Sequence, residues 1–332
     1  MRLIAALALG AVALATPEFA SAQQAPATGG EDVLKEWEIE WGGRTRDPHV
    51  APDGKVWFVG QAGNYIAWFD PATEERRQYE IEDGTNPHNL LVDDDGYVWY
   101  AGNRNGRIGK LNPETGEAEI IMTGDARDPH TLIFDGRGYV WFTSQQANHV
   151  GRVHMETHEV EVIQAFESPG RPYGIVIDDE GAAWVALFNT SHIMRVDPAT
   201  MDTRLYDKAT PESRSRRIAL TDDGRVWYVD EPRGFLGAIH PATGEVQEWP
   251  MPGGDDSRPY ALNRDDQGLL WASQTGPDKK LTAFDPEREE FVAVFDVSHN
   301  IRHMALDSRN GALWFGTDAN QVGRVLTTHV GH

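Results

Sequence analysis

Cysteine is absent from the 332 residues of this chain. Disulfide bonds, a lipid-modified cysteine and thiol chemistry are therefore excluded. Long apolar runs are also missing, apart from Leu3 to Ala15, which is too short for a comfortable membrane span. Basic residues are few, since 30 Lys and Arg stand against 52 Asp and Glu, for a formal net charge of −22. Nucleic acid and a membrane surface are therefore not expected as partners.

The first part of the chain reads as a targeting segment. Arg2 precedes the apolar run, and the small residues Ala20–Ala22 follow it. This order predicts a secretory signal peptide over residues 1–22, cleaved after Ala22, with an uncleaved anchor as the alternative. Residues 23–32 are polar and rich in small residues, which favours a flexible lead-in. We expect an exported protein, periplasmic or secreted.

A tryptophan recurs along the rest of the chain at intervals of 42 to 44 residues. The seven copies are Trp57, Trp99, Trp141, Trp184, Trp227, Trp271 and Trp314. Short-strand units with a period in the low forties are typical of a β-propeller. The sequence therefore predicts an all-β, seven-bladed propeller forming a single domain over residues 33–332, with the repeated Trp packed in the core.

One repeat unit shows how each blade is expected to be built. We predict its four strands at Asn89–Asp93, Tyr97–Ala101, Arg107–Asn112 and Glu117–Met122. Turn residues such as Asp95-Gly96 separate them.

The two ends of the repeated region are expected to meet. Val33–Trp41 alternates like the outer strand of a later repeat, Glu245–Met251. The chain ends its last repeat at Gln321–Leu326, which resembles only a third strand. We therefore predict that the N-terminal strand completes the last blade, so that closure leaves no exposed edge strand.

The positions that vary between repeats are the candidates for function. Counted eleven residues back from each Trp, the second and later repeats carry His88, His130, Tyr173, Arg216, Tyr260 and His303. The first repeat is three residues shorter here, and we take His49 as its equivalent. Two residues earlier, the seven repeats carry Asp47, Asn86, Asp128, Arg171, Arg214, Arg258 and Ile301.

Because inner strands line the channel of a propeller, these residues are expected at one mouth of that channel. Four histidines and two aspartates would lie on one side, and arginines with tyrosines on the other. Imidazoles can act as base, acid or metal ligand, and arginines suit a carboxylate or an oxyanion. The alternative is structural: the rim charges neutralise one another, and the histidines cap inner-strand backbone groups. Four residues after the Trp, Glu231 and Asp318 are the only acidic residues.

The repeats, of the form P-[HY]-x-[IL]-x-x-D-x-x-G-x-[VL]-W-F followed by N-x-[IV]-G-[RK]-[IVL], resemble the streptogramin B (virginiamycin B) lyase family. The pattern is visible at Pro87–Leu111, Pro129–Val153, Pro172–Val196 and Arg302–Val325. The resemblance covers essentially the whole chain after the leader. It implies a seven-bladed propeller that opens the ester of a cyclic depsipeptide by elimination, with magnesium.

The resemblance also implies roles for individual residues. The family's catalytic histidine, in a Glu-Pro-His sequence of the last blade, corresponds to His303, and a glutamate of the same blade corresponds to Asp318. Ile301 stands where the family has the other glutamate, and Tyr260 where it has a second histidine. Two of the four positions thus keep their chemical type.

We therefore expect His303 as the base and Asp318 as its carboxylate partner. A divalent cation, Mg²⁺ or another, would be bound by these two residues. Arg258, Arg302 or His49 would stabilise the developing charge.

Three functions remain open on the sequence. The first is a lyase-like enzyme that opens an ester or lactone bond in a small molecule. The second is a non-catalytic propeller that binds a ligand or a protein, because fold alone does not decide function. The third is a metal-dependent lactone hydrolase, for which the sequence offers few inward-facing acids. In the first reading the partner is a small-molecule ligand in the channel mouth, and the protein is expected to be a monomer.

Overall fold

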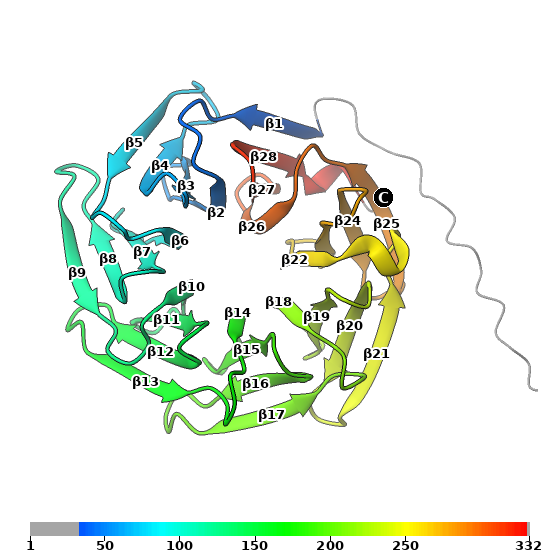
Figure 1. The fold of residues 1–332 in the computed structure, drawn as a ribbon. Helices are drawn as coiled ribbons and strands as arrows, with labels where there is room; N and C mark the ends of the chain where they lie inside the picture. Colours follow the sequence, from blue (N-terminus) through cyan, green and yellow to red (C-terminus); the bar gives the residue numbers. More distant parts are fainter. Residues whose placement is uncertain (1–32, 331–332) are drawn as a thin grey trace, which may run out of the picture.

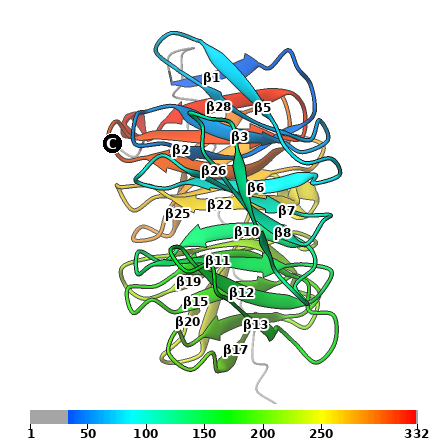
Figure 2. The same ribbon diagram turned by 90° about the vertical axis from the view of Figure 1, so that its left-hand side faces the viewer.

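The computed structural model of the chain describes residues 33–330. Seven four-stranded antiparallel sheets are arranged as blades around a central axis (Figure 1). Seen edge-on, the ring is a thick disk (Figure 2). The predicted seven-bladed propeller is confirmed, and the described residues contain only two short 3₁₀ helices, Gly254–Ser257 and Thr327–His329. The predicted signal peptide and lead-in lie outside the described residues.

The four strands of each blade run from the axis outwards. The inner strands are β2 (Thr45–Val50), β6 (Pro87–Val92), β10 (Pro129–Phe134), β14 (Pro172–Ile177), β18 (Ser215–Leu220), β22 (Pro259–Arg264) and β26 (Ile301–Asp307). The second strands are β3 (Val56–Gly60), β7 (Val98–Gly102), β11 (Tyr139–Ser144), β15 (Ala183–Leu187), β19 (Val226–Asp230), β23 (Leu270–Gln274) and β27 (Ala312–Thr317).

The outer half of each blade is more exposed. The third strands are β4 (Tyr65–Phe69), β8 (Arg107–Leu111), β12 (His149–His154), β16 (His192–Val196), β20 (Phe235–His240), β24 (Lys280–Asp285) and β28 (Gln321–Leu326). The outer strands are β5 (Arg76–Glu80), β9 (Ala118–Met122), β13 (Val160–Gln164), β17 (Thr203–Asp207), β21 (Glu245–Pro250), β25 (Glu290–Asp296) and β1 (Leu34–Glu38). Blades are numbered 1 to 7 from β2 to β26.

The turn between inner and second strands is tied to the repeated Trp. In blade 6 the carboxylate of Asp265 accepts hydrogen bonds from the Leu269 backbone N–H, at 2.9 Å, and from Nε1 of Trp271, at 2.7 Å. Asp93, Asp135 and Asp178 bind the Trp of blades 2, 3 and 4 in the same way. The aspartate of the repeat therefore satisfies both the turn and the indole N–H, which a buried Trp needs.

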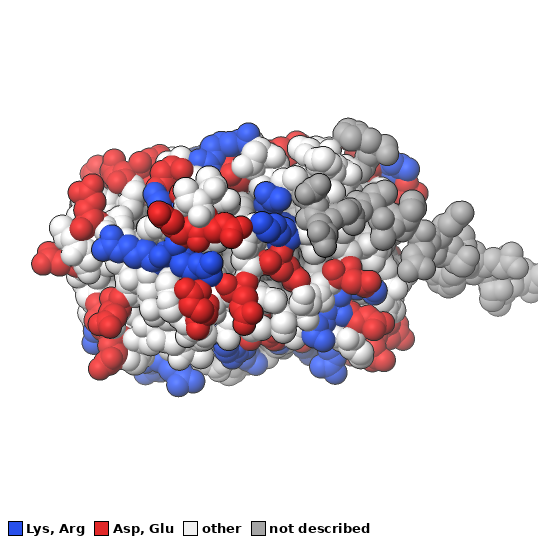
Figure 3. All heavy atoms as spheres, turned by 90° about the horizontal axis from the view of Figure 1, so that it is seen from above, with Lys and Arg blue, Asp and Glu red and all other residues white. Residues whose placement is uncertain are grey.

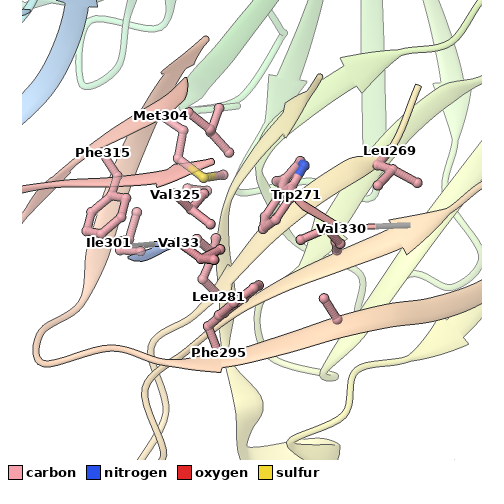
Figure 4. Close-up of a cluster of buried hydrophobic side chains, with 14 residues drawn as sticks. Val33, Leu269, Trp271, Leu281, Phe295, Ile301, Met304, Phe315, Val325 and Val330 are labelled. Carbon is pink, nitrogen blue, oxygen red and sulfur yellow. The ribbon is translucent and has the colours of Figure 1, made fainter. Parts of the chain in front are cut away.

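Apolar side chains fill the spaces between neighbouring blades. Between blades 6 and 7, Trp271, Leu281 and Phe295 pack against Met304 and Phe315 (Figure 4). Trp99, Trp141, Trp227 and Trp271 are fully buried, as expected for core positions. Each Trp thus stabilises the contact of its own blade with a neighbour.

The N-terminal strand closes the ring, as predicted. β1 lies beside β28 (Figure 1) and pairs with it antiparallel, Leu34 opposite Val325 and Glu38 opposite Gln321. Trp37 of β1 stacks on Trp314 at a centroid distance of 5.4 Å. The last blade is therefore built from both ends of the described chain.

The outer surface carries charges of both signs. Acidic and basic side chains are interspersed on the face shown in Figure 3. No helix among residues 33–330 has the length and apolarity needed to cross a membrane.

Candidate functional site at the channel mouth

Strand pairing shows which residues of the seven inner strands lie at the same height along the channel axis. Leu132 pairs with Phe142, the residue after Trp141, and Met304 pairs with Phe315, the residue after Trp314. We take as reference the inner-strand residue that pairs with the residue after the repeated Trp. Two residues before it, at the mouth end of the channel, every blade carries a large side chain. These seven residues, which we call the mouth ring, are Arg46, His88, His130, Tyr173, Arg216, Tyr260 and Arg302.

The sequence alignment was wrong in the first blade. His49 pairs with Trp57, whereas in blade 3 it is Ile133 that pairs with Trp141. His49 is therefore three residues further along its strand than His130, and Arg46 takes the ring position. A plain count of eleven residues back from Trp57 gives Arg46, so the assumed shortening of the repeat caused the error.

The alignment was also wrong in the last blade, by one residue. Asp307 precedes Trp314 by seven residues, whereas Asp135 precedes Trp141 by six. The extra turn residue puts Arg302 at the mouth-ring position of this blade. His303 is then one residue further along the inner strand, away from the mouth. By the same shift, Asn300 and Ile301 are level with Asp128 and Pro129 of blade 3. The predicted arc of four level histidines is thus reduced to two.

The two remaining histidines of the ring are stacked on each other. The imidazoles of His88 and His130 have a centroid separation of 3.5 Å, and both side chains are buried. His130 Nδ1 lies 2.9 Å from the hydroxyl of Thr131. Burial, together with nearby charges, lowers the pKa of both histidines well below the usual value, so both are neutral at pH 7.

The opposite side of the ring holds two tyrosines surrounded by arginines. The hydroxyls of Tyr173 and Tyr260 are hydrogen-bonded to each other, and both side chains are buried. The guanidinium carbon of Arg302 lies 4.6 Å from the Tyr260 ring centroid, and that of Arg216 lies 4.8 Å away. These positions allow cation–π contacts between both arginines and one ring.

The surrounding arginines give the two phenols different pKa values. Burial raises the pKa of Tyr173 to about 12. Burial also opposes ionisation of Tyr260, but Arg46, Arg216 and Arg302 outweigh it and lower the pKa of this phenol. Tyr260 is therefore the more acidic partner of the hydrogen-bonded pair.

The next residue of each inner strand forms a second level, which we call the cross-channel layer. Its members are Asp47, Asn89, Thr131, Gly174, Arg217, Ala261 and His303. Arg217 of blade 5 reaches across the channel, where its Nη2 donates to Asp47 Oδ2 of blade 1 at 2.7 Å. Its Nη1 donates to Thr131 Oγ1 of blade 3 at 3.0 Å.

A glycine gives this arginine its path. A Cβ on Gly174 would lie 2.6 Å from the carbonyl oxygen of Arg216 and 3.3 Å from Cδ of Arg217. The contact with the backbone oxygen is too short for a real Cβ and the contact with Cδ is tight, so glycine at this level of blade 4 lets the two inner strands approach closely. Neither Arg217 nor Gly174 was singled out from the sequence, because the partners of Arg217 lie 86 and 170 residues away.

Asp47 is the buried anion of the cross-channel layer. Its side chain is fully buried, and Asn89 Nδ2 donates to Oδ2 at 3.1 Å. Burial alone would raise the pKa of Asp47, but Arg217, His303 and Arg46 together lower it. The carboxylate therefore stays ionised and stabilises the guanidinium that crosses the channel.

The other predicted binding residues lie around the mouth. Asp128 accepts hydrogen bonds from Ser144 Oγ at 2.6 Å and from the Gln146 backbone N–H at 2.6 Å, so it organises its own loop. Arg171 lies with its guanidinium 5.5 Å from the Phe188 ring, and Arg258 is exposed. The binding roles assigned to these residues stay predictions.

A pocket of about 290 Å³ lies at this end of the channel, beside blades 4 to 6. Phe188, Arg214, Glu231 and Arg258 are among its lining residues. Arg216 borders this area, since its guanidinium lies 4.0 Å from the Phe188 ring and its Nε donates to Glu231 Oε2 at 2.5 Å. The lining also includes Asp255 and Asp256, and no mouth-ring residue is part of it, so the pocket adjoins the arginine–tyrosine side of the mouth ring.

The residues expected to bind a divalent cation do not fit that task. Asp318 Oδ2 accepts from Arg302 Nη2 at 2.7 Å and from Asn300 Nδ2 at 2.9 Å, so the carboxylate is already paired with a cation. Residues 33–330 contain no group of three or more His, Asp or Glu side chains that could hold a metal ion. We therefore derive no step through a metal.

The ring of blades, the ordered mouth ring and the adjoining pocket define a seven-bladed propeller with a polar site at one end of its channel. Comparison with models of known protein families identifies the family of this chain. Residues 47–325 match the virginiamycin B lyase family, and the chain belongs to that family.

Solved structures show the same fold at low sequence identity. Virginiamycin B lyase from Staphylococcus aureus superposes with a TM-score of 0.78 at 20% identity, covering 88% of this chain and 98% of that one. A catalytically inactive His-to-Ala variant of the same enzyme, solved with quinupristin, gives a TM-score of 0.79 at 21% identity, with the same coverage.

The same fold is found in proteins of other descriptions. Hydrazine synthase from Kuenenia stuttgartiensis gives a TM-score of 0.70 at 15% identity, covering 83% of this chain and 93% of that one. A search of curated protein sequences finds no match.

Proposed function

We propose that this propeller binds a small molecule carrying an anionic group at the mouth of its channel. The main support for this proposal is that Arg46, Arg216 and Arg302 converge on the hydrogen-bonded Tyr173–Tyr260 pair. Arg46 is 6% exposed, and its Nε and Nη2 have no hydrogen-bond partner among the described residues. Unpaired buried donors are costly, and an anion is the group that satisfies guanidinium donors best.

Ligand binding is favoured over a histidine-based elimination. The mouth-ring position of the last blade carries Arg302, which is paired with Asp318. His303, the expected base, lies one step deeper, and burial lowers its pKa to about 3. Such an imidazole is a weak proton acceptor at neutral pH.

A lyase-like reaction is the second candidate function, and the lowered pKa of Tyr260 is the observation that favours it. In this reaction the Tyr260 phenolate would take a proton from a carbon that is alpha to a carbonyl group and adjacent to the carbon bearing the ester or lactone oxygen. A carbon–carbon double bond forms as the bond to that oxygen breaks. Arg216 and Arg302 would stabilise the carboxylate that leaves when the carbon–oxygen bond breaks. This route uses a different base from the one that the family resemblance implied.

Calorimetric titration with a panel of small carboxylates, and with the matching amides, tests the proposal. We expect a carboxylate to bind and its amide to bind at least about tenfold more weakly. Arg216→Met and Arg302→Met should each weaken binding, while Arg77→Met, at an exposed residue of the outer strand β5, should not. Equal affinity in Arg216→Met, Arg302→Met and the unmodified protein would refute the site.

The same ligands, offered as esters and lactones, separate the two candidates. Formation of the unsaturated elimination product, lost in Tyr260→Phe with binding retained, would establish the lyase, whereas a hydroxy acid formed by hydrolysis would refute it. Binding without turnover in the unmodified protein would leave the ligand-binding function.

The proposed setting is outside the cytoplasm, because residues 1–22 have the pattern of a secretory signal peptide. Cell fractionation, with mass measurement of the mature N-terminus, tests export and the cleavage site. We also propose a monomer, which light scattering of the purified protein tests.

A further inference from the structure

A second cavity lies in the channel on the far side of the cross-channel layer. Its volume is about 400 Å³, within the range of small-molecule sites. The lining comes from all seven inner strands and includes residues near their ends, such as Val50, Ile177, Leu220 and Leu306. The mouth ring lies near the starts of the same strands, so the two sites are at opposite ends of the channel.

The wall of this cavity is mostly apolar. At the level of the strand residue that pairs with the repeated Trp, five of the seven lining residues are apolar, namely Leu91, Ile133, Val176, Ala219 and Ala305. The other two are His49 and Asn263. An apolar wall of this kind is suited to a hydrocarbon portion of a ligand, whose burial there is favourable.

The inner end of the cavity is polar and incompletely hydrogen-bonded. Arg217, Thr131 and His303 of the cross-channel layer line it. Arg217 is 3% exposed, yet its Nε has no hydrogen-bond partner within residues 33–330, and the same holds for Nδ1 of His303. Buried polar atoms without partners are rare in proteins and point to an additional group in the site.

The charge at this inner end favours an anion. Asp47 lies between two guanidinium groups, with Arg217 Nη2 at 2.7 Å and Arg46 Nε at 3.6 Å from its oxygens. One negative charge thus faces two positive charges. The cavity histidines add no charge at neutral pH, because burial lowers the pKa of His49 to about 4 and of His303 to about 3.

The opening of the cavity adds little to this balance. Arg264 lines the cavity near the end of β22 and forms an ion pair with Asp222. Asn263 donates from Nδ2 to the carbonyl oxygen of Met304 at 2.9 Å and is therefore already used. The polar groups left for a ligand lie at the inner end.

We propose that this cavity is a second binding site that takes an amphipathic carboxylate. The hydrocarbon tail lies along the apolar wall, and the carboxylate lies at the inner end with Arg217 and His303. This site is distinct from the anion site proposed at the channel mouth, and the charge of Arg46 contributes to both.

Decanoate is the probe for the test. Decanol, which has the hydrocarbon chain but no carboxylate, and butyrate, which has the carboxylate but a short chain, are the controls. In calorimetric titrations of the mature Arg216→Met variant, whose mouth site is weakened, we expect one decanoate to bind per chain. Decanol and butyrate should each bind at least about tenfold more weakly. No binding of decanoate would refute the site, and decanol binding as tightly as decanoate would refute the assignment of a carboxylate.

Variants of the wall locate the binding. Ala305→Leu and, as a second variant, Ile133→Phe place bulk at half-buried residues that line the cavity, and each should weaken decanoate binding by at least about tenfold. Ala199→Leu, at an exposed turn, is the matched control and should bind normally. Arg216→Met at the mouth should also bind decanoate normally. Unchanged affinity in both wall variants would overturn the proposal, whatever the outcome at the mouth.

Discussion

Arg217 of blade 5 joins three blades, because its guanidinium donates to Asp47 of blade 1 and to Thr131 of blade 3. Replacing it with Met removes the cation and leaves Asp47 buried beside Arg46 alone. We expect Arg217→Met to lower the free energy of unfolding by about 3–5 kcal/mol, the usual cost of breaking a buried ion pair. Chemical denaturation measures it. The double variant Asp47→Asn/Arg217→Met should lose less than Arg217→Met does, and an equal or larger loss would contradict this account.

The neutral histidines predict a dependence of stability on pH. The folded-state pKa of His49 is about 4, below its unfolded value near 6.5. Between these values the unfolded chain binds a proton that the folded chain does not, so the free energy of unfolding falls as pH falls from about 6.5. His49 should contribute a slope of up to about 1.4 kcal/mol per pH unit.

Denaturation at several pH values checks this contribution. His49→Asn retains an acceptor for the Val92 backbone N–H, which donates to His49 Nδ1 at 3.2 Å. Its stability should depend less steeply on pH between 6 and 5 than that of the unmodified protein. An unchanged slope would show that His49 is protonated in the folded state.

At this scale the sequence predicted residue types better than residue places. His88, His130, Tyr173, Arg216 and Tyr260 were placed correctly on the mouth ring. His49 was not, because the first repeat was assumed to be three residues shorter than it is. His303 was not, because an inner strand keeps its register with the Trp strand when the turn between them changes length, as it does in the last blade. One added turn residue moves every inner-strand residue of that blade by one place, which exchanges His303 for Arg302. The roles of these residues in binding or catalysis stay predictions.

In blades 2, 3, 4 and 6 the turn aspartate accepts a hydrogen bond from the repeated Trp. Asp265 is buried and accepts from the backbone N–H groups of Gln267 and Leu269 as well as from Trp271 Nε1. Asp265→Ala leaves these donors without their partner, and each buried unpaired donor costs about 1–3 kcal/mol. We expect a loss of a few kcal/mol in total, measured by thermal or chemical unfolding.

Blade 5 supplies the matched control for this substitution. There Thr221 Oγ1 accepts from Trp227 Nε1 at 2.9 Å. Asp265→Thr should therefore recover part of the stability lost in Asp265→Ala. If the two variants are equally unstable, the indole hydrogen bond is not the important contact.

The strands were predictable because their signals are local. Alternating side chains, the Asp-Gly turns and the repeated Trp recur in each unit, and the observed strands of blade 2 differ from the predicted ones by one or two residues at their ends. Contacts across the channel carry no such periodic signal. The hydrogen bond between Tyr173 and Tyr260 joins residues 87 apart, in blades that are not neighbours.

Closure of the ring depends on β1 at the scale of the whole molecule. Trp37 is 8% exposed, stacks on Trp314 and donates from Nε1 to Glu74 Oε1 at 3.0 Å. We expect Trp37→Ala to lower the free energy of unfolding by about 3–5 kcal/mol and to loosen β1 from β28. The freed edge of β28 should then promote aggregation, which light scattering during mild heating detects.

Trp249 provides the comparison for that prediction. It stacks on Trp227 at 5.2 Å from the outer strand of blade 5, whose four strands are continuous in sequence. Trp249→Ala should lose similar stability without releasing a chain end. Equal aggregation of the two variants would mean that ring closure by β1 is not the reason for it.

The arginine that crosses the channel also bears on how the molecule unfolds. In a linear repeat array each unit contacts only its neighbours, and the array can melt in stages. Here Arg217 of blade 5 is bonded to Asp47 of blade 1 and Thr131 of blade 3. If any one of these blades opened, a buried charge or donor would lose its partner, so partly unfolded rings are strongly disfavoured. We therefore expect Arg217 to couple blades 1, 3 and 5, so that they unfold together in a single calorimetric transition.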